Sequence, residues 1–250
     1  METKTETIRS QALTLGLSNT RSQLDTLLHT AEQRDMTHME FLEYLLNEEI
    51  RCRLDKAKER RLREACFPYE KRLKDFDIGF SASLTAKNLR QLGELKWIEQ
   101  VYNLIFLGPP GVGKTHLALG LGYQAAEEGY KVSFVTMAGL IQLLKTEEIS
   151  RKSKLRLNPI YSSAVVIIDE IGYLPIDHKE ASLFFHLISG LHEQSSIILT
   201  SNKGFEDWPE LFGDTEMVTA ALDRLMHHCD VIRMDGKSYR LEHRKTFLEK

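Results

Sequence analysis

One glycine-rich octapeptide constrains this chain more than any other feature. Residues 108–115 read Gly-Pro-Pro-Gly-Val-Gly-Lys-Thr and fit the phosphate-loop pattern G-x-x-x-x-G-K-[ST]. Backbone N–H groups of such a loop surround the α- and β-phosphates, and the Lys114 ammonium reaches the β- and γ-phosphates. The residues expected to contact a nucleotide, which we take to be ATP, are Gly108, Pro109, Pro110, Gly111, Val112, Gly113, Lys114, Thr115 and His116.

The flanks of the octapeptide match the structural context that the pattern needs. Residues 103–107 are a short apolar run, typical of a buried parallel strand. Residues 115–121 follow with helical spacing of apolar side chains. A strand, a glycine loop and a helix would place the positive end of the helix dipole at the phosphates.

A second apolar run, Val165–Ile168, ends in the acids Asp169 and Glu170. Ligands of open α/β sheets bind at the carboxyl ends of the strands. We therefore expect Asp169 to hold Mg²⁺ together with the Thr115 hydroxyl, and Glu170 to act as the general base for the attacking water. The alternative is that the two acids merely begin a helix or a solvated turn.

A third apolar run covers residues 196–202 and ends in Asn202. In a phosphate-loop sheet, this side chain would orient the attacking water or contact the γ-phosphate. Asn is also common in β-turns, and Lys203-Gly204 follows it, so a plain turn is the alternative.

The order of predicted elements indicates an α/β fold. Strands at residues 131–136 and 230–234 join the three apolar runs, and helical segments separate them. Such alternation predicts a five-stranded parallel sheet between helices. Residues 85–100 are expected to form one helix, and 206–214 a loop. The predicted organisation is a small all-α N-terminal domain at 1–66, a linker and entry helix at 67–102, and the ATPase domain at 103–250.

The N-terminal region reads as helical throughout. Residues 37–40, Thr-His-Met-Glu, form a capping box that precedes an apolar run. Leu42, Leu46, Ile50 and Leu54 then recur every four residues. Such a stripe needs a partner, which is either another helix of this chain or another subunit.

Composition restricts the class of protein. The 250 residues carry a formal net charge of −3 and contain three widely spaced cysteines. No apolar run reaches 18 residues, so we expect no membrane span, and reduced thiols favour a cytoplasmic location. His227 and His228 have no partners at metal-ligand spacing, so the sequence predicts no metal site there.

Two basic stretches could contact nucleic-acid phosphates. Residues 51–74 contain ten Lys or Arg and four Asp or Glu, and a second basic stretch covers residues 151–156. A solvated helix face is the alternative for each. The candidate DNA-binding residues are Lys145, Arg151, Lys152, Lys154 and Arg156.

Several segments together resemble one branch of the AAA+ ATPases, the IstB-type and DnaC-type proteins. The likeness covers residues 36–245, and its motifs are Gly108–Leu119, Asp169–Pro175, Thr200–Asn202, Leu222–His228 and Ser238–Arg240. It favours the IstB transposition helpers of bacterial insertion sequences.

This resemblance implies an ATPase that assembles as a homo-oligomer on double-stranded DNA without strong sequence specificity and recruits a partner transposase. It also implies that Arg224 acts in trans as an arginine finger, and it makes Arg240 a candidate second sensor. The guanidinium is a fixed cation that suits γ-phosphate charge. The chain ends soon after Arg240, so we expect no large C-terminal lid.

Other functions remain open at this point. A DnaC-like helicase loader would prefer single-stranded DNA and a helicase ring. A non-hydrolysing switch would need no general base, so Glu170 argues against it. A small-molecule kinase is disfavoured because Asp169, Glu170 and Asn202 together suit attack by water.

Overall fold

The computed structural model describes residues 3–80, 83–173, 176–212 and 215–244 of the chain. These residues divide into two compact units, Met1–Arg60 and Arg61–Lys250. The division falls inside helix α3 (His38–Ala65), whereas the sequence analysis places a domain boundary just after that helix.

The first unit is helical, as expected. Helices α1 (Lys4–Thr14) and α2 (Ser18–Gln33) precede α3, which begins with the predicted capping box between Thr37 and Glu40. The buried carboxylate of Glu49 accepts hydrogen bonds from the backbone N–H groups of Asn19 (2.9 Å) and Thr20 (3.0 Å) at the start of α2. An acid at this end of a helix satisfies N–H groups that have no partner within the helix.

The apolar stripe on α3 is not covered within its own unit. Leu42, Leu46, Ile50 and Leu54 are between 47% and 64% exposed. Of the two partners that the sequence leaves open, a helix of the same chain does not cover the stripe among the described residues, and another chain remains a prediction.

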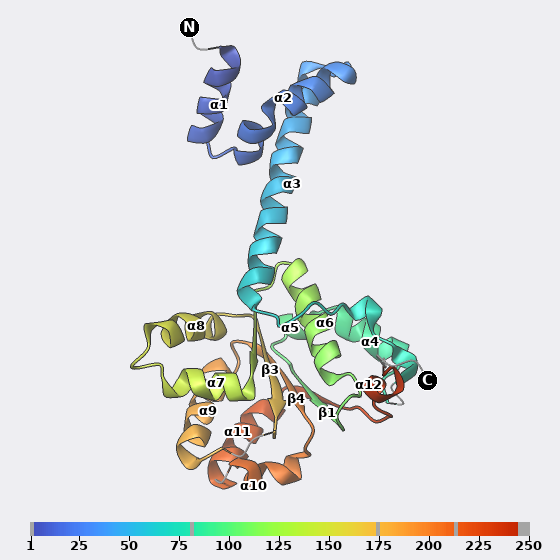
Figure 1. Ribbon diagram of the computed structural model, residues 1–250, viewed down its shortest axis with the longest axis vertical. Coiled ribbons are helices and arrows are strands. Elements are labelled where there is room, and N and C mark those ends of the chain that lie inside the picture. The colour runs from blue at the N-terminus through green and yellow to red at the C-terminus, as the bar shows by residue number, and fades with distance from the viewer. Residues whose placement is uncertain (1–2, 81–82, 174–175, 213–214, 245–250) are drawn as a thin grey trace. The chain divides into compact units, whose positions relative to one another are not determined.

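Within the described part of the second unit, five parallel strands form the predicted sheet, in the order β2-β3-β4-β1-β5. Figure 1 labels the three inner strands, β3, β4 and β1. The fold class is thereby confirmed. β1 has neighbours on both sides, so the loop that follows it opens at the middle of the sheet. The strands are β1 (Asn103–Leu107), β2 (Val132–Thr136), β3 (Val165–Ile171), β4 (Ser196–Ser201) and β5 (Cys229–Arg233).

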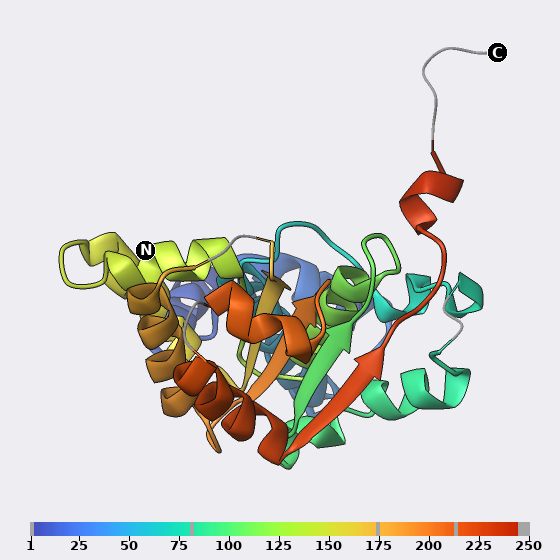
Figure 2. The ribbon, with the colours of Figure 1, turned by 90° about the horizontal axis from the view of Figure 1, so that it is seen from below.

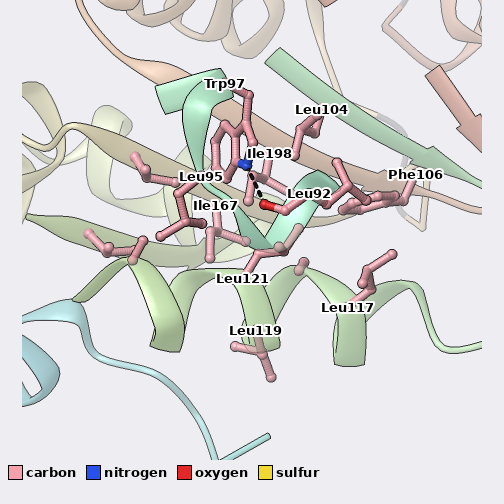
Figure 3. Close-up of a cluster of buried hydrophobic side chains, with 14 of the residues drawn as sticks. Leu92, Leu95, Trp97, Leu104, Phe106, Leu117, Leu119, Leu121, Ile167 and Ile198 are labelled. Atoms are coloured by element: carbon pink, nitrogen blue, oxygen red, sulfur yellow. Dashed lines mark hydrogen bonds between the residues drawn. The ribbon is translucent and has the colours of Figure 1, made fainter. Parts of the chain in front are cut away.

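Helices cover both faces of the sheet, because the strands are apolar on both sides (Figure 2). On one face, Leu104 and Phe106 of β1 pack with Leu117 and Leu121 of α6 (Figure 3). The buried Trp97 on that face donates from Nε1 to the Leu92 carbonyl at 2.9 Å. That face is covered by α4 (Ala86–Gly93), α5 (Lys96–Glu99) and α6 (Lys114–Glu127).

The other face packs against helices that follow β2, β3 and β4. Ile105 and Leu107 contribute to this second core, together with Phe184 and Trp208. Its helices are α7 (Met137–Lys145), α8 (Arg151–Tyr161), α9 (His178–Leu191), α10 (Trp208–Phe212) and α11 (Thr215–His227).

Two local predictions are wrong. The helix expected over 85–100 is broken at Leu95, whose φ of 59° is left-handed, so α4 and α5 are separate. The loop expected over 206–214 contains the turn η3 (Phe205–Asp207) and helix α10, because Trp208 and Phe212 are buried against α9 and α11. Such burial overrides a weak local preference for loop structure.

Further short elements lie in the predicted linker and near the end of the chain. They are η1 (Leu73–Asp75), η2 (Ile78–Phe80) and α12 (Tyr239–Glu242). Among the described residues, no helix is both long and apolar enough to cross a membrane.

Candidate functional site

A cleft of about 560 Å³ lies where β1, β3 and β4 end. The loop after β1, the acids near the end of β3 and the polar residues at the end of β4 all line it. The sheet thus brings together Lys114, Thr115, Asp169, Glu170 and Asn202, which lie in separate motifs along the sequence.

The glycines of the loop are required by its geometry. Gly108, Gly111 and Gly113 have φ values of 152°, 88° and 100°, which other residues rarely adopt. A Cβ on Gly108 would collide with the Met234 carbonyl oxygen, and one on Gly111 would collide with Ser238 Oγ. The loop therefore depends on glycine both for its dihedral angles and for close packing against residues that follow β5.

Lys114 begins α6 and is buried in the loop. Its Nζ donates to the carbonyl oxygens of Gly108 (2.6 Å) and Pro109 (2.8 Å). Burial lowers the pKa of Lys114 to about 8, the nearby Arg240 charge acts in the same direction, and Asp169 opposes it. The ammonium is thus held at the loop but is poorly solvated, so an anion in the cleft would stabilise its charged form.

Thr115 and Asp169 face each other, as the sequence predicts for a metal pair. The Thr115 hydroxyl donates to Asp169 Oδ1 (2.9 Å) and lies 3.2 Å from Oδ2. Asp169 is 4% exposed, so its carboxylate is directed into the cleft and not into bulk water. A hydroxyl and a buried carboxylate are hard oxygen donors, which fit Mg²⁺.

Thr200 is a site residue that the sequence analysis did not identify. Its hydroxyl donates to Asp169 Oδ1 and accepts the backbone N–H of Glu170 at 3.0 Å. The side chain is buried at the end of β4. Thr200 therefore positions both acids from the neighbouring strand. The one signal for this role in the sequence is that Thr200 begins a run of three polar residues at the end of an apolar strand.

The two acids differ in orientation because the strand pairing is irregular there. Two residues, Asp169 and Glu170, separate Ile168 from Ile171 on β3, whereas Thr200 alone separates their β4 partners. This β-bulge gives Glu170 a φ of 66°, and the residue is exposed while Asp169 is buried. Bulges commonly re-aim side chains beside active sites, and this one separates the proposed metal ligand from the proposed base.

Asn202 also lines the cleft, beyond the end of β4. Its Oδ1 is buried and has no hydrogen-bond partner among the described residues. An unpaired buried oxygen costs free energy unless a ligand or water satisfies it. This position suits the predicted contact with the attacking water.

The predicted linker contributes a second side of the cleft. Phe76 is buried and lies close to Gly113. Its ring meets the His116 ring edge to face, with the two ring centroids 5.5 Å apart. His116 Nε2 lies 3.0 Å from the Arg72 carbonyl oxygen. Burial and then the Asp169 charge raise the pKa of Tyr69, which lines the same cleft. The sequence analysis described this segment only as a linker and placed none of its residues at the site.

The segment after β5 closes the cleft from a third direction. The Tyr239 N–H donates to the Gly111 carbonyl oxygen at 3.0 Å, and Arg240 lines the cleft. The structure thus brings Arg240, the candidate second sensor, to the loop of its own chain.

Arg224 lies elsewhere. It lines a different cleft, together with Asn103, Ser195 and His228, which stand where β1, β4 and β5 begin. Its Nη1 donates to the Ala220 carbonyl (3.0 Å), and its guanidinium stacks over Phe185 at 4.9 Å. Because the strands are parallel, Arg224 is at the opposite edge of the sheet from the phosphate loop.

The candidate DNA-binding residues lie at the end of α7 and on α8. Arg151, Lys152 and Lys154 are exposed, whereas Lys145 pairs with Glu180 at 2.7 Å. Arg156 donates to the Phe134 carbonyl and contacts Cys66 Sγ, so it is held against the domain.

Comparison with known proteins identifies relatives along most of the chain. The family model of IstB-like ATP binding proteins matches residues 10–246. A putative ATP-binding protein of insertion sequence IS21 from Pseudomonas aeruginosa is 41% identical over 231 residues, which cover 92% of this chain and 87% of the relative.

Solved structures extend the comparison to the fold. DnaI superposes with a TM-score of 0.55 at 17% identity, covering 68% of this chain and 91% of its own. The DnaC helicase loader superposes with a TM-score of 0.51 at 19% identity, covering 70% and 99%. At such low identities these similarities show a shared fold alone.

Proposed function

Because this chain belongs to the family of IstB-like ATP-binding proteins, we propose that it is an ATPase that assembles on duplex DNA and recruits a partner transposase. The observation that carries hydrolysis is the network in which Thr200 links Asp169 to the backbone of Glu170 beside the phosphate loop. A protein that only binds nucleotide has no need for an exposed second acid held in this position.

The residues of the cleft have distinct parts in the proposed reaction. Lys114 exchanges its two carbonyl partners for β- and γ-phosphate oxygens. Thr115 and Asp169 would hold Mg²⁺, which supplies charge neutralisation at the phosphates. The Glu170 carboxylate accepts a proton from water as the water oxygen bonds to the γ-phosphorus. The bond from the γ-phosphorus to the bridging oxygen breaks, which leaves ADP and phosphate.

Arg240 already lines the cleft from the same chain, and we propose that a second subunit supplies a further cation on the outer side of the γ-phosphate. Arg224 cannot reach the loop of its own chain from the opposite sheet edge. If the amino ends of the strands in a neighbouring copy faced the carboxyl ends of the strands in this chain, the neighbour's Arg224 would lie at this cleft. Hydrolysis would then depend on assembly, which suits a protein that acts only when it is gathered on DNA.

The DNA contact is proposed for the exposed face of α8. Three exposed basic residues lie on this face: Arg151, Lys152 and Lys154. Arg156 is on the same helix but donates to the Phe134 carbonyl, so it is not assigned to DNA. Contacts of this kind are to phosphates, so they give affinity without sequence specificity and weaken with salt.

Phosphate release tests the proposal when it is measured with and without duplex DNA, alongside sedimentation with a non-hydrolysable ATP analogue. We expect duplex DNA to increase turnover and to support an ATP-dependent oligomer. The double variant Arg151→Glu/Lys152→Glu should lose duplex affinity and show a shallower salt dependence. Lys87→Glu/Arg90→Glu, an equal charge change on exposed residues of α4, is the matched control. Turnover that ignores DNA, with no oligomer, would refute the proposal.

A helicase loader is the alternative function. The family match and the IS21 relative favour the transposition helper over it, because the likeness to the loader is one of fold alone. Binding of single-stranded DNA in preference to duplex, with co-purification of a helicase, would reverse this choice.

A further inference from the structure

We propose that His192, Glu193 and His227 form a binding site for a divalent transition metal ion of the Zn²⁺ class. One ligand atom from each residue lies within 4.8 Å of those of the other two. The proposal does not depend on the function proposed above. It departs from the sequence analysis, which found no partners for His227 because its neighbours in space are 34 and 35 residues earlier in the chain.

A backbone turn sets the positions of two of the three ligand residues, His192 and Glu193. The His192 N–H donates to the Ile188 carbonyl (2.9 Å), and the Ser195 N–H donates to the Leu191 carbonyl (3.0 Å). Glu193 stands between them with a left-handed φ of 58°. This tight turn at the end of α9 holds His192 and Glu193 side by side.

The third ligand comes from the end of a helix that packs beside α9. His227 is the last residue of α11, and both helices belong to one buried core. The imidazole rings of His192 and His227 have centroids 5.8 Å apart and meet edge to face. His192 Nε2 lies 3.8 Å from Glu193 Oε1.

The chemistry of this set favours Zn²⁺ over Mg²⁺. Two imidazoles and one carboxylate are ligands that Zn²⁺ binds at about 2.0–2.2 Å, so donor atoms in a tetrahedral site stand about 3.4 Å apart. Glu193 and His227 are exposed, so small rotations can close the remaining distance without disturbing the core. A fourth position stays open for water or for a donor from another chain.

The location gives the site a structural consequence. His192, Glu193 and Arg224 line the same cleft, and Phe185 of α9 carries the stacked guanidinium. A bound ion would tie the end of α9 to the end of α11, which are the helices that position Arg224. We therefore expect the metal to stabilise this edge of the second unit.

Titration of the untagged protein with Co²⁺ tests the proposal, because tetrahedral Co²⁺ has intense visible absorption. The titration is done in excess Mg²⁺, and Zn²⁺ should then displace the Co²⁺. We expect one ion per chain, a rise in Tm, and a loss of affinity of at least about tenfold in His192→Ala and in His227→Asn. Two control variants should bind Co²⁺ normally. They are His186→Ala, at an exposed histidine on α9, and Asp169→Asn, on β3 in the other cleft.

Three results would overturn the proposal. They are octahedral absorption only, unchanged affinity in both histidine variants, and a sulfur-to-cobalt charge-transfer band, which would indicate binding by thiolates. If His192→Ala folds poorly, His227→Asn decides the question, because His227 is exposed at the end of its helix.

Discussion

The two edges of one parallel sheet carry complementary halves of the proposed chemistry. At the carboxyl ends of the strands, a loop, two acids and a threonine form a connected polar network. At the amino ends, Arg224 stacks on an aromatic ring and donates to a carbonyl of its own helix. The first edge holds the phosphate loop with Lys114 and Arg240, and the second edge holds Arg224, away from any phosphate loop of its own chain.

Asn103 shows that the second edge is nevertheless ordered. Its side chain donates to the Leu225 carbonyl (2.9 Å) and accepts the Ile197 N–H (2.9 Å), next to Arg224. The arginine therefore extends from a fixed framework. Under the proposed function, the difference between the edges means that a single chain holds all the parts of the site but cannot bring them together.

The largest expected effect comes from removing the guanidinium of Arg224. Arg224→Ala should lower kcat for DNA-stimulated ATP hydrolysis about 10³-fold and leave ATP affinity unchanged, since finger arginines stabilise the transition state. Steady-state phosphate release and nucleotide-binding titrations measure the two quantities. Normal hydrolysis by this variant would show that another residue is the finger.

Mixing two variants sharpens the comparison. Glu170→Gln should lower turnover about 10²-fold, because a general base contributes 10²–10⁴, while ATP stays bound and the assembly on DNA persists. In a mixture with Arg224→Ala, some sites combine a native Glu170 with a neighbour's native Arg224. Turnover above that of either variant alone is expected, and its absence would argue against a finger in trans.

The pH dependence of ATP binding tests the first edge by itself. Lys114 has a pKa of about 8 in the free protein, and phosphate beside it raises that pKa. The ammonium is therefore lost as pH rises above 8 unless ATP is bound, so ATP affinity should fall by up to about tenfold per pH unit there. The contribution of Lys114 to ATP affinity should be flat below about pH 7, where the ammonium is almost fully protonated in both states. Lys114→Arg, which stays charged, should remove this slope, and a slope retained in that variant would assign it to another group.

The smallest expected effect concerns Thr200. Thr200→Val keeps the shape of the side chain and removes its hydroxyl, which leaves Asp169 and the Glu170 N–H each without one partner. A cost of about 1 kcal/mol, or roughly fivefold in kcat, is expected, together with a higher Mg²⁺ requirement. Ser195→Ala removes a buried hydroxyl at the other edge, bonded to the Ser163 carbonyl, and should change stability but not the Mg²⁺ requirement.

Local sequence patterns were sufficient for much of the fold and of the first edge. The phosphate loop could be predicted because its residues are contiguous and because its positive φ values, which require glycine, are a local property of the backbone. The strands could be read because both faces of a parallel sheet are buried, which makes each strand a short apolar run. Helix α10 was missed because its five residues are held by burial of Trp208 and Phe212, which no local pattern reports.

The sequence by itself determined the cradle of this protein: Gly108 to Thr115, the acids Asp169 and Glu170, and a sheet that would carry them. Tertiary structure alone decided that a β-bulge points the two acidic side chains in different directions and that Thr200 hydrogen-bonds to Asp169 and to the Glu170 backbone. It also decided that Phe76 and Tyr69 line the cleft. It alone placed Arg224 at the far edge and His227 beside His192. The reason is physical: a motif of adjacent residues has local geometry, whereas register, packing and the approach of distant residues arise only when the strands pair and the helices bury their apolar faces.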